Sequence, residues 1–192
     1  MNPELGLFAL ALALPVALVQ SIVPLIGAQR RDAALMAVAG PAALAQMLLI
    51  GTAFAALTQA FIASDFSVMN VYQNSHTAKP LLYKISGVWG NHEGSLLLWV
   101  SILAVFGAAV AAFGDGLPDR LKARALAVQG LIGAGFLSFI LFTSNPFLRI
   151  DPAPVQGMGL NPLLQDPGLA FHPPMLYLGY VGFSMAFSFA VA

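Results

Sequence analysis

The chain has 192 residues, of which 59% are hydrophobic and 8% are charged. With a mean hydropathy of +0.83, this composition exceeds what a water-soluble core of that length can absorb, so we expect an integral membrane protein. Eight basic and eight acidic residues leave no net charge to attract nucleic acid, and nucleic-acid binding is set aside. The absence of cysteine excludes disulfides, iron–sulfur clusters on the chain's own thiolates and a thiol nucleophile.

Five apolar runs are long enough to cross a bilayer, which takes about 20 helical residues. They predict helices at about residues 5–28, 37–63, 95–113, 123–142 and 173–192. The expected fold class is therefore an all-α polytopic membrane protein with about five transmembrane helices. The first run carries Glu4 instead of a basic signal-peptide start and is too long for one, so we expect a retained helix. Because the last run is still apolar at Ala192, we interpret the chain as the N-terminal part of a longer protein.

The placement of Lys and Arg predicts the orientation. The short connections near residues 30 and 120 hold five basic residues, whereas the longer connections at about 64–94 and 143–172 hold only three. Short loops rich in Lys and Arg stay on the cytoplasmic side of the membrane. We therefore expect the N-terminus outside, together with both long connections as periplasmic loops.

The first four predicted helices carry no Asp, Glu, Lys, Arg or His near their centres. Ion and proton pathways usually need such groups, so a self-contained pathway is not expected. The fourth run is rich in small residues that allow close approach to a neighbouring helix in lipid. These are Ala125, Ala127, Gly130, Gly133, Ala134 and Gly135.

The first long loop leads into the third helix through Trp89, Asn91, His92 and Glu93. As bare physics, Trp89 is as consistent with an interfacial anchor as with a functional role. A carboxylate such as Glu93 can orient an imidazole, but adjacent residues on one helix do not face each other, so His92 and Glu93 are expected to act on different partners. Asn91 or the Gly94–Ser95 pair is expected to cap the helix, with Glu93 favourably placed in its first turn.

The second long loop holds five prolines, which predict a shaped, non-helical connection. It delivers His172 to the start of the last helix, where Pro173 and Pro174 suit the first turn. There the helix dipole would keep the imidazole neutral and able to donate a lone pair to iron. The residues alone leave open a histidine hydrogen-bonded in a tight turn. His76 is interpreted as a solvated loop residue.

Three motifs follow one another along the chain. They are Trp89-Gly-Asn-His-Glu-Gly-Ser-Leu-Leu-Leu-Trp99, Phe139-Ile-Leu-Phe-Thr-Ser-Asn-Pro-Phe147, and the segment from Leu160 to Gly182 with Leu-Gln-Asp-Pro-Gly and His-Pro-Pro-Met-Leu-Tyr. In this order they resemble the CcmF family of cytochrome c maturation proteins, the membrane haem lyase subunit, and its relative dedicated to nitrite reductase. The resemblance covers nearly the whole chain but does not distinguish these two branches.

The resemblance implies a multi-pass protein of the bacterial inner membrane that takes haem from a periplasmic haem chaperone. It would assist thioether attachment of that haem to apocytochrome c, as a subunit of a haem–apocytochrome c lyase. The implied partners are this chaperone, apocytochrome c with its thiol-reducing adaptor subunits, the lipid bilayer and the remaining C-terminal part of the protein. The substrate supplies the thiols, in keeping with the absence of cysteine here.

By the same resemblance, His172 is implied as an external axial ligand of non-covalent, b-type haem that is later transferred. Further candidate site or partner contacts are Trp89, Asn91, His92, Glu93, Pro173, Pro174 and Tyr177. The family's tryptophan-rich WWD segment, second external histidine and two transmembrane histidines are expected beyond Ala192. Two other functions stay open, a scaffold that docks the chaperone and the apocytochrome adaptor, and a transporter of haem across the membrane.

Overall fold

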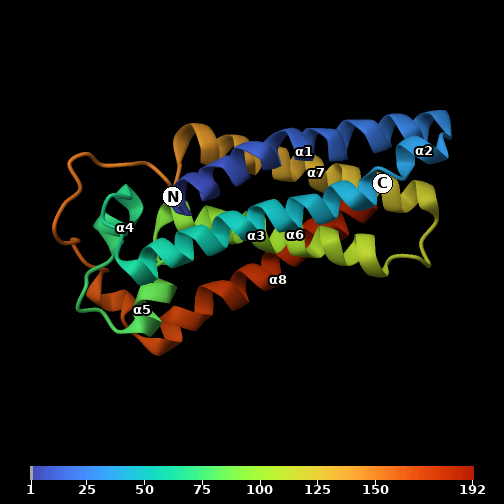
Figure 1. Ribbon diagram of the computed structural model, residues 1–192. Helices are drawn as coiled ribbons and strands as arrows, with labels where there is room; N and C mark the ends of the chain where they lie inside the picture. Colours follow the sequence, from blue (N-terminus) through green and yellow to red (C-terminus); the bar gives the residue numbers. More distant parts are fainter. Residues whose placement is uncertain (1) are drawn as a thin grey trace.

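A computed structural model describes residues 2–192 as a helical bundle with both long connections gathered at one end (Figure 1). Within residues 2–192, five helices are long and apolar enough to cross a membrane, which confirms the predicted fold class. They are α1 (Asn2–Arg30), α3 (Ala39–Ala63) with the short α2 (Ala33–Met36) before it, α6 (His92–Phe113), α7 (Asp119–Thr143) and α8 (Pro167–Val191). Two short helices, α4 (Met69–Asn74) and α5 (Leu81–Ser86), and one 3-10 turn, Pro162–Leu164, lie in the long connections.

The expectation that the last helix starts at residue 173 is wrong. α8 begins at Pro167, six residues earlier, because Asp166 accepts a hydrogen bond from the Leu169 amide at 3.1 Å as its N-cap. Pro167 then occupies a first-turn position that needs no N–H donor. Pro173 and Pro174 consequently lie inside the helix, and the second long connection ends before Pro167.

Other boundaries shift for the same local reason. Asn91 caps α6 by accepting a hydrogen bond from the Gly94 amide at 2.8 Å, so α6 begins at His92 instead of residue 95. Asp32 caps α2 by accepting from the amides of Ala34 and Leu35. This separate turn lies just before the span expected at 37–63, and α3 itself begins at Ala39. The N-caps of α6 and α8 are polar, so an apolar-run criterion places the starts of these two helices too late.

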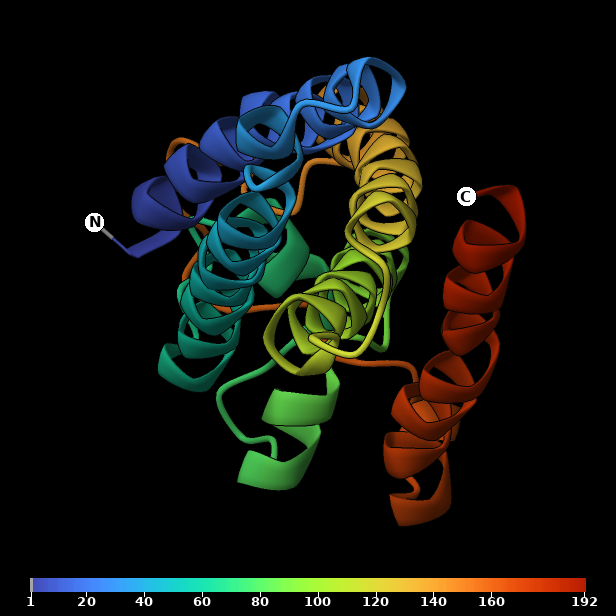
Figure 2. The same ribbon diagram turned by 90° about the vertical axis from the view of Figure 1, so that its right-hand side faces the viewer.

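The core lies between α1, α3, α6 and α7. Viewed from the end of the bundle, these four helices surround a common centre, and α8 stands against the outside of α6 and α7 (Figure 2). Leu10, Leu57, Phe61, Leu97 and Leu137 are fully buried in this core. Few side chains of α8 are buried, so most of its surface faces away from the bundle.

Gly130 lets α7 approach α1 closely. A Cβ atom at Gly130 would lie 2.8 Å from Ser21 Oγ and 3.1 Å from the Ala17 carbonyl oxygen. This agrees with the small-residue contact expected for the helix. Gly135 does not belong to that contact, because a Cβ there would meet nothing within 4 Å.

The two long connections pack against each other. The Met69 amide donates to the Leu148 carbonyl at 2.8 Å, and the Ile150 amide donates to the Ser67 carbonyl at 2.8 Å. Arg149 pairs with Glu4 and Asp65, which ties the second connection to the start of α1 and to the end of α3. We call the end of the bundle that carries residues 64–91 and 144–166 the loop end. Its two connections are held together by hydrogen bonds and ion pairs.

The matched glycines provide a test of helix packing. We expect Gly130→Ala to destabilise the protein by about 1–3 kcal/mol, because the new methyl group meets the Ala17 backbone carbonyl and the core has no room for it. Gly135→Ala is expected to be neutral or to stabilise by up to about 1 kcal/mol through helix propensity. Thermal unfolding of the detergent-solubilised variants measures the difference. Equal unfolding temperatures for the two variants would contradict the close α1–α7 contact.

Candidate functional site

His172 is an exposed residue in the second turn of α8, at the loop end of the bundle. The sequence predicted His172 at the start of the helix, and this is wrong, because α8 begins at Pro167. The argument from the helix dipole therefore loses most of its force. Its ring makes no hydrogen bond with any residue that the structure describes, and it does not lie in a tight turn. The alternative of a hydrogen-bonded turn histidine therefore does not describe this side chain.

The surroundings of His172 are apolar and exposed. Phe171 is 57% exposed, Met175 67% and Leu176 50%. Met175 and Leu176 follow His172 by three and four residues, so they share one face of α8 with it. A lone imidazole beside accessible apolar side chains suits a large apolar ligand that carries a metal ion. It does not suit a metal ion held by side chains alone, and residues 2–192 contain no group of three possible metal-binding side chains.

Trp89 and Pro174 are complementary in hydrogen bonding. Proline has no N–H, so Pro174 leaves the Ala170 carbonyl, four residues earlier in α8, without its helical donor. Trp89 Nε1 donates to this Ala170 carbonyl oxygen at 2.9 Å. The Trp89 ring also lies nearly parallel to Phe54, at a centroid distance of 6.5 Å. Trp89 therefore joins α8 to the junction before α6, a role that the sequence signal of an interfacial tryptophan did not specify.

Asn91 organises the junction itself. Its Oδ1 accepts from the Gly94 amide and from Asn70 Nδ2, and its Nδ2 donates to the Gly87 carbonyl at 2.7 Å. Gly94 permits this turn, because a Cβ there would lie 1.6 Å from the Val88 carbonyl oxygen. These contacts hold the chain that carries Trp89 in one place.

His92 and Glu93 face different surroundings, as expected for adjacent helical residues. His92 Nε2 lies 3.1 Å from Ser144 Oγ, and its ring meets the Phe139 ring edge-on at 6.5 Å. His92 thus joins α6 to the end of α7, and no hydrogen bond or ring contact links it to His172 within the described chain. Glu93 lies in the first turn of α6, where its charge is favourable to the helix dipole.

The remaining candidates are placed as follows. The Tyr177 ring packs edge-on against Tyr180, at a centroid distance of 5.3 Å. Pro173 lies beside Pro174 inside α8 and frees the Leu169 carbonyl in the same way. His76 is a half-buried loop residue, and its Nδ1 accepts a hydrogen bond from the Ala78 amide at 3.2 Å.

Lys79 is a buried cation at the loop end that the sequence did not single out. Only 9% of the residue is exposed, and its Nζ donates to the Asn74 carbonyl at 3.2 Å. Burial, and secondarily the positive charge of Lys84, lowers the pKa of Lys79 from 10.5 to about 8. The loop end therefore carries a titratable group near physiological pH.

Comparisons with known proteins place this site in context. Residues 89–192 match the family model described as cytochrome C assembly protein. The chain is 71% identical, over 98% of its length, to cytochrome c-type biogenesis protein ccl1 of Rhodobacter capsulatus, and 51% identical over 100% to CcmF of Escherichia coli. Against NrfE of Haemophilus influenzae the identity is 41% over 100% of the chain.

The fold is similar to the solved structure of cytochrome c heme lyase CcmF. The TM-score is 0.86 with 26% sequence identity, covering 100% of this chain and 30% of that one. The chain spans about 29% of the length of ccl1 and 30% of the length of CcmF from Escherichia coli. The matched region, 89–192, contains both Trp89 and His172.

A double-mutant cycle tests the link between Trp89 and Pro174. Trp89→Phe keeps an aromatic ring, although a smaller one, and removes the N–H donor to Ala170, so we expect a loss of about 1–3 kcal/mol in stability. In a Pro174→Ala background the restored amide pairs with Ala170, and the same Trp89→Phe change should cost markedly less. Hydrogen exchange at the start of α8 and thermal unfolding measure both costs. Equal costs in the two backgrounds would show that Trp89 acts by packing alone.

The buried Lys79 makes stability depend on pH. Its pKa is lower in the folded protein than in the unfolded chain, so the unfolded chain binds more protons between pH 8 and 10.5. The unfolding temperature should therefore rise as pH increases through this window. Below the window, Lys79 should make no pH-dependent contribution to it. Lys79→Met should remove the rise, whereas Lys122→Met, at the opposite end of the bundle, should keep it. A rise that survives in Lys79→Met would assign it to another group.

Proposed function

The chain belongs to the cytochrome C assembly protein family, and from this premise we propose that it acts in c-type cytochrome biogenesis as part of a haem–apocytochrome c lyase. It takes haem from a periplasmic haem chaperone and assists its thioether attachment to apocytochrome c. The relatives named as cytochrome c-type biogenesis proteins and the CcmF structure support this activity. The chaperone, the apocytochrome and its thiol-reducing adaptor are the proposed partners.

The observation that carries the proposal is the state of the His172 side chain. It is exposed, makes no hydrogen bond within the described chain, and stands on an apolar face of α8 beside Met175 and Leu176. An imidazole nitrogen binds haem iron axially, and the apolar neighbours cover part of the macrocycle. His172 therefore acts as a ligand and positioning group, not as a general base.

Haem is the substrate in this scheme, and it brings the iron and the vinyl groups to which apocytochrome thiols add. The role of this chain is to hold the porphyrin against α8 while the histidine of apocytochrome takes over the iron. Trp89, through Ala170, fixes the turn that precedes His172. The second axial ligand is proposed to come from the remainder of the protein, because within residues 2–192 the contacts of His76 and His92 are with other residues than His172.

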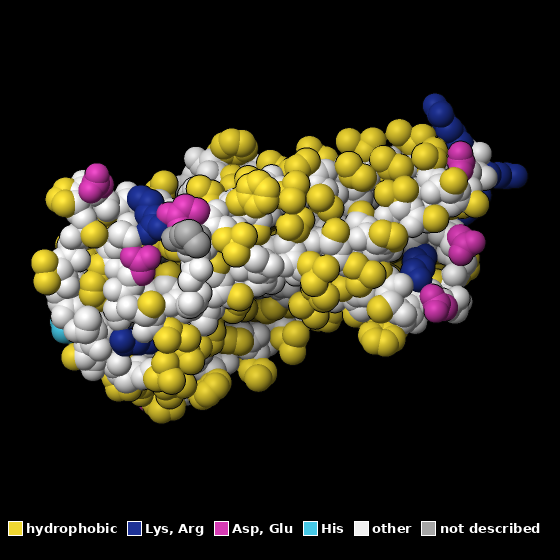
Figure 3. Space-filling view, viewed as in Figure 1, with side chains coloured by type: hydrophobic (Ala, Val, Ile, Leu, Met, Phe, Trp, Pro, Cys, Tyr) yellow, Lys and Arg dark blue, Asp and Glu magenta, His cyan; other side chains and the backbone are white. Residues whose placement is uncertain are grey.

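The proposed orientation puts the loop end in the periplasm. Basic residues on the ends of α1 and α7 lie at the opposite end of the bundle, where several Lys and Arg side chains gather on the surface (Figure 3). This matches the positive-inside rule for a plasma-membrane protein. His172 is then on the side where apocytochrome c meets its haem.

Haem transport through these helices has less support than surface handling. The cavity between α1, α3, α6 and α7 has a volume of about 20 Å³, far below that of a porphyrin. A scaffold is the stronger rival, because the exposed apolar face around Phe171 and Met175 also suits a docked protein. The two readings differ in what they require of the imidazole.

Replacement of His172 separates ligand from scaffold. In the full-length protein co-expressed with the haem chaperone, we expect His172→Ala to lose most of the chaperone-delivered haem, and added imidazole to restore part of it. Haem content and the optical spectrum of the purified protein measure this. His76→Ala is the matched control, because His76 is a loop residue at the same end of the bundle, and it should retain haem. Unchanged occupancy and spectrum in His172→Ala would favour the scaffold.

A further inference from the structure

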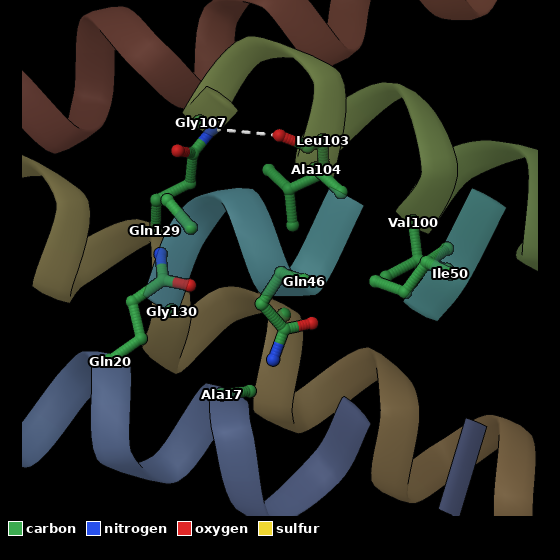
Figure 4. Close-up of a pocket in the computed structure, with 12 residues that line it drawn as sticks. Ala17, Gln20, Gln46, Ile50, Val100, Leu103, Ala104, Gly107, Gln129 and Gly130 are labelled. Carbon is green, nitrogen blue, oxygen red and sulfur yellow. Dashed lines mark hydrogen bonds between the residues drawn. The ribbon is translucent and has the colours of Figure 1, made fainter. Parts of the chain in front are cut away.

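A small cavity lies where α1, α3, α6 and α7 meet inside the membrane-spanning part of the bundle (Figure 4). Its volume is about 20 Å³. Small residues on all four helices, among them Ala17, Ala43, Ala104 and Gly107, leave this space open. Three glutamines, Gln20, Gln46 and Gln129, reach its wall from α1, α3 and α7 and supply its polar groups.

The amide nitrogens of these glutamines are fixed by neighbouring helices. Gln20 Nε2 donates to the Leu126 carbonyl at 2.9 Å, and Gln129 Nε2 donates to the Leu103 carbonyl at 3.1 Å. A glutamine oxygen in either place would face another oxygen, so these contacts decide which end of each amide is nitrogen. The oxygens must then point the other way, and Figure 4 shows the Gln20 oxygen turned toward Gln46.

Both of these oxygens lack a donor in the described chain. Gln20 and Gln129 are each 3% exposed, and neither Oε1 has a hydrogen-bond partner among residues 2–192. A buried carbonyl oxygen without a partner costs about 1–3 kcal/mol. Lipid offers no donor, and the backbone amides of the surrounding helices are used within the helices.

We propose that this cavity is a binding site for one structural water molecule, which donates a hydrogen bond to Gln20 Oε1. A water site needs at least about 10–15 Å³ and two to four polar partners. The volume meets that need and excludes anything as large as a quinone or a porphyrin. Gln129 Oε1 is a second acceptor on the wall, and Gln46, which uses one amide hydrogen on the Ala13 carbonyl, has another to donate.

The water would join helices that otherwise meet through small apolar residues. Gln20 belongs to α1, Gln46 to α3 and Gln129 to α7, so one bridging molecule links three of the four core helices. Gln129 Nε2 also lies 2.6 Å from Met185 Sδ, which extends the network to α8. Gly107 leaves room for the Gln129 side chain, because a Cβ at this position would lie 2.6 Å from Gln129 Oε1.

A map of the full-length protein that resolves ordered water tests the site directly. We expect a density peak at hydrogen-bond distance, about 2.7–3.2 Å, from Gln20 Oε1. Gln20→Met, which keeps the side-chain length but removes the acceptor, should lose this peak. Gln59→Met, on the exposed face of α3, should keep it. A dry cavity in the wild-type protein, or a protein donor on Gln20 Oε1, would overturn the proposal.

A second measurement on the wild-type protein does not depend on the folding of any variant. With ¹⁵N-labelled glutamine, magnetisation transfer from water to the Gln20 and Gln46 side-chain amides should report a long-lived contact within the membrane. The Gln59 amide should show only the exchange of a surface group. Absence of water contacts at both buried amides would contradict the proposal even if all three glutamines are correctly placed.

Discussion

Backbone carbonyl groups inside a membrane must find their hydrogen-bond donors within the protein, because hydrocarbon supplies none. Regular helices meet this demand along most of α1, α3, α6 and α7. The tandem prolines of α8 break it at one place, since Pro173 and Pro174 remove the donors to Leu169 and Ala170. The indole of Trp89 supplies the donor for Ala170. The position of the first turns of α8 therefore depends on a tryptophan that lies about eighty residues earlier in the chain.

The hydrogen bond from Trp89 to Ala170 also determines where His172 lies in the candidate site. His172 stands two residues after Ala170, in the turn that Trp89 holds. Trp89 is itself placed by the junction around Asn91 and Gly94. The two long connections, one leading to α6 and the other to α8, also contact each other at the loop end. There Arg149 of the second connection pairs with Glu4 and Asp65. Contacts with the loop end therefore hold the exposed His172 imidazole in position, although α8 itself has few buried side chains.

The same demand for hydrogen-bond partners governs the polar side chains of the core. Gln20, Gln46 and Gln129 each donate across a helix–helix contact to a backbone carbonyl of another helix. Such hydrogen bonds contribute to association in lipid, where apolar contact alone gives little preference for one neighbour over another. Small residues such as Gly130 allow the approach that these bonds require. Packing and polar contact therefore act together in the four-helix core.

The sequence by itself determined the membrane class, the five long helices and the segments that bear His172 and Trp89. Hydrophobic runs of bilayer length allow hardly any other structure, because the backbone must be helical there. Local capping also lies within reach of the sequence, and Asn91 was one of two candidates for the α6 cap. Pro173 and Pro174 suit a first turn and so predict a helix start there, whereas Asp166 and Pro167 provide the actual start of α8 earlier in the chain.

Only the tertiary structure decided which groups complete one another. The pairing of Trp89 with the Ala170 carbonyl joins residues distant in the chain, and no local pattern contains it. Three uncharged glutamines converge on one cavity, and no sequence pattern marks them, because they belong to three different helices. His172 could be named from its motif, but its exposure depends on how α8 packs against α6 and α7. Hydrogen-bond satisfaction and burial are properties of the assembled bundle, so the sequence specifies the groups and the fold selects their partners.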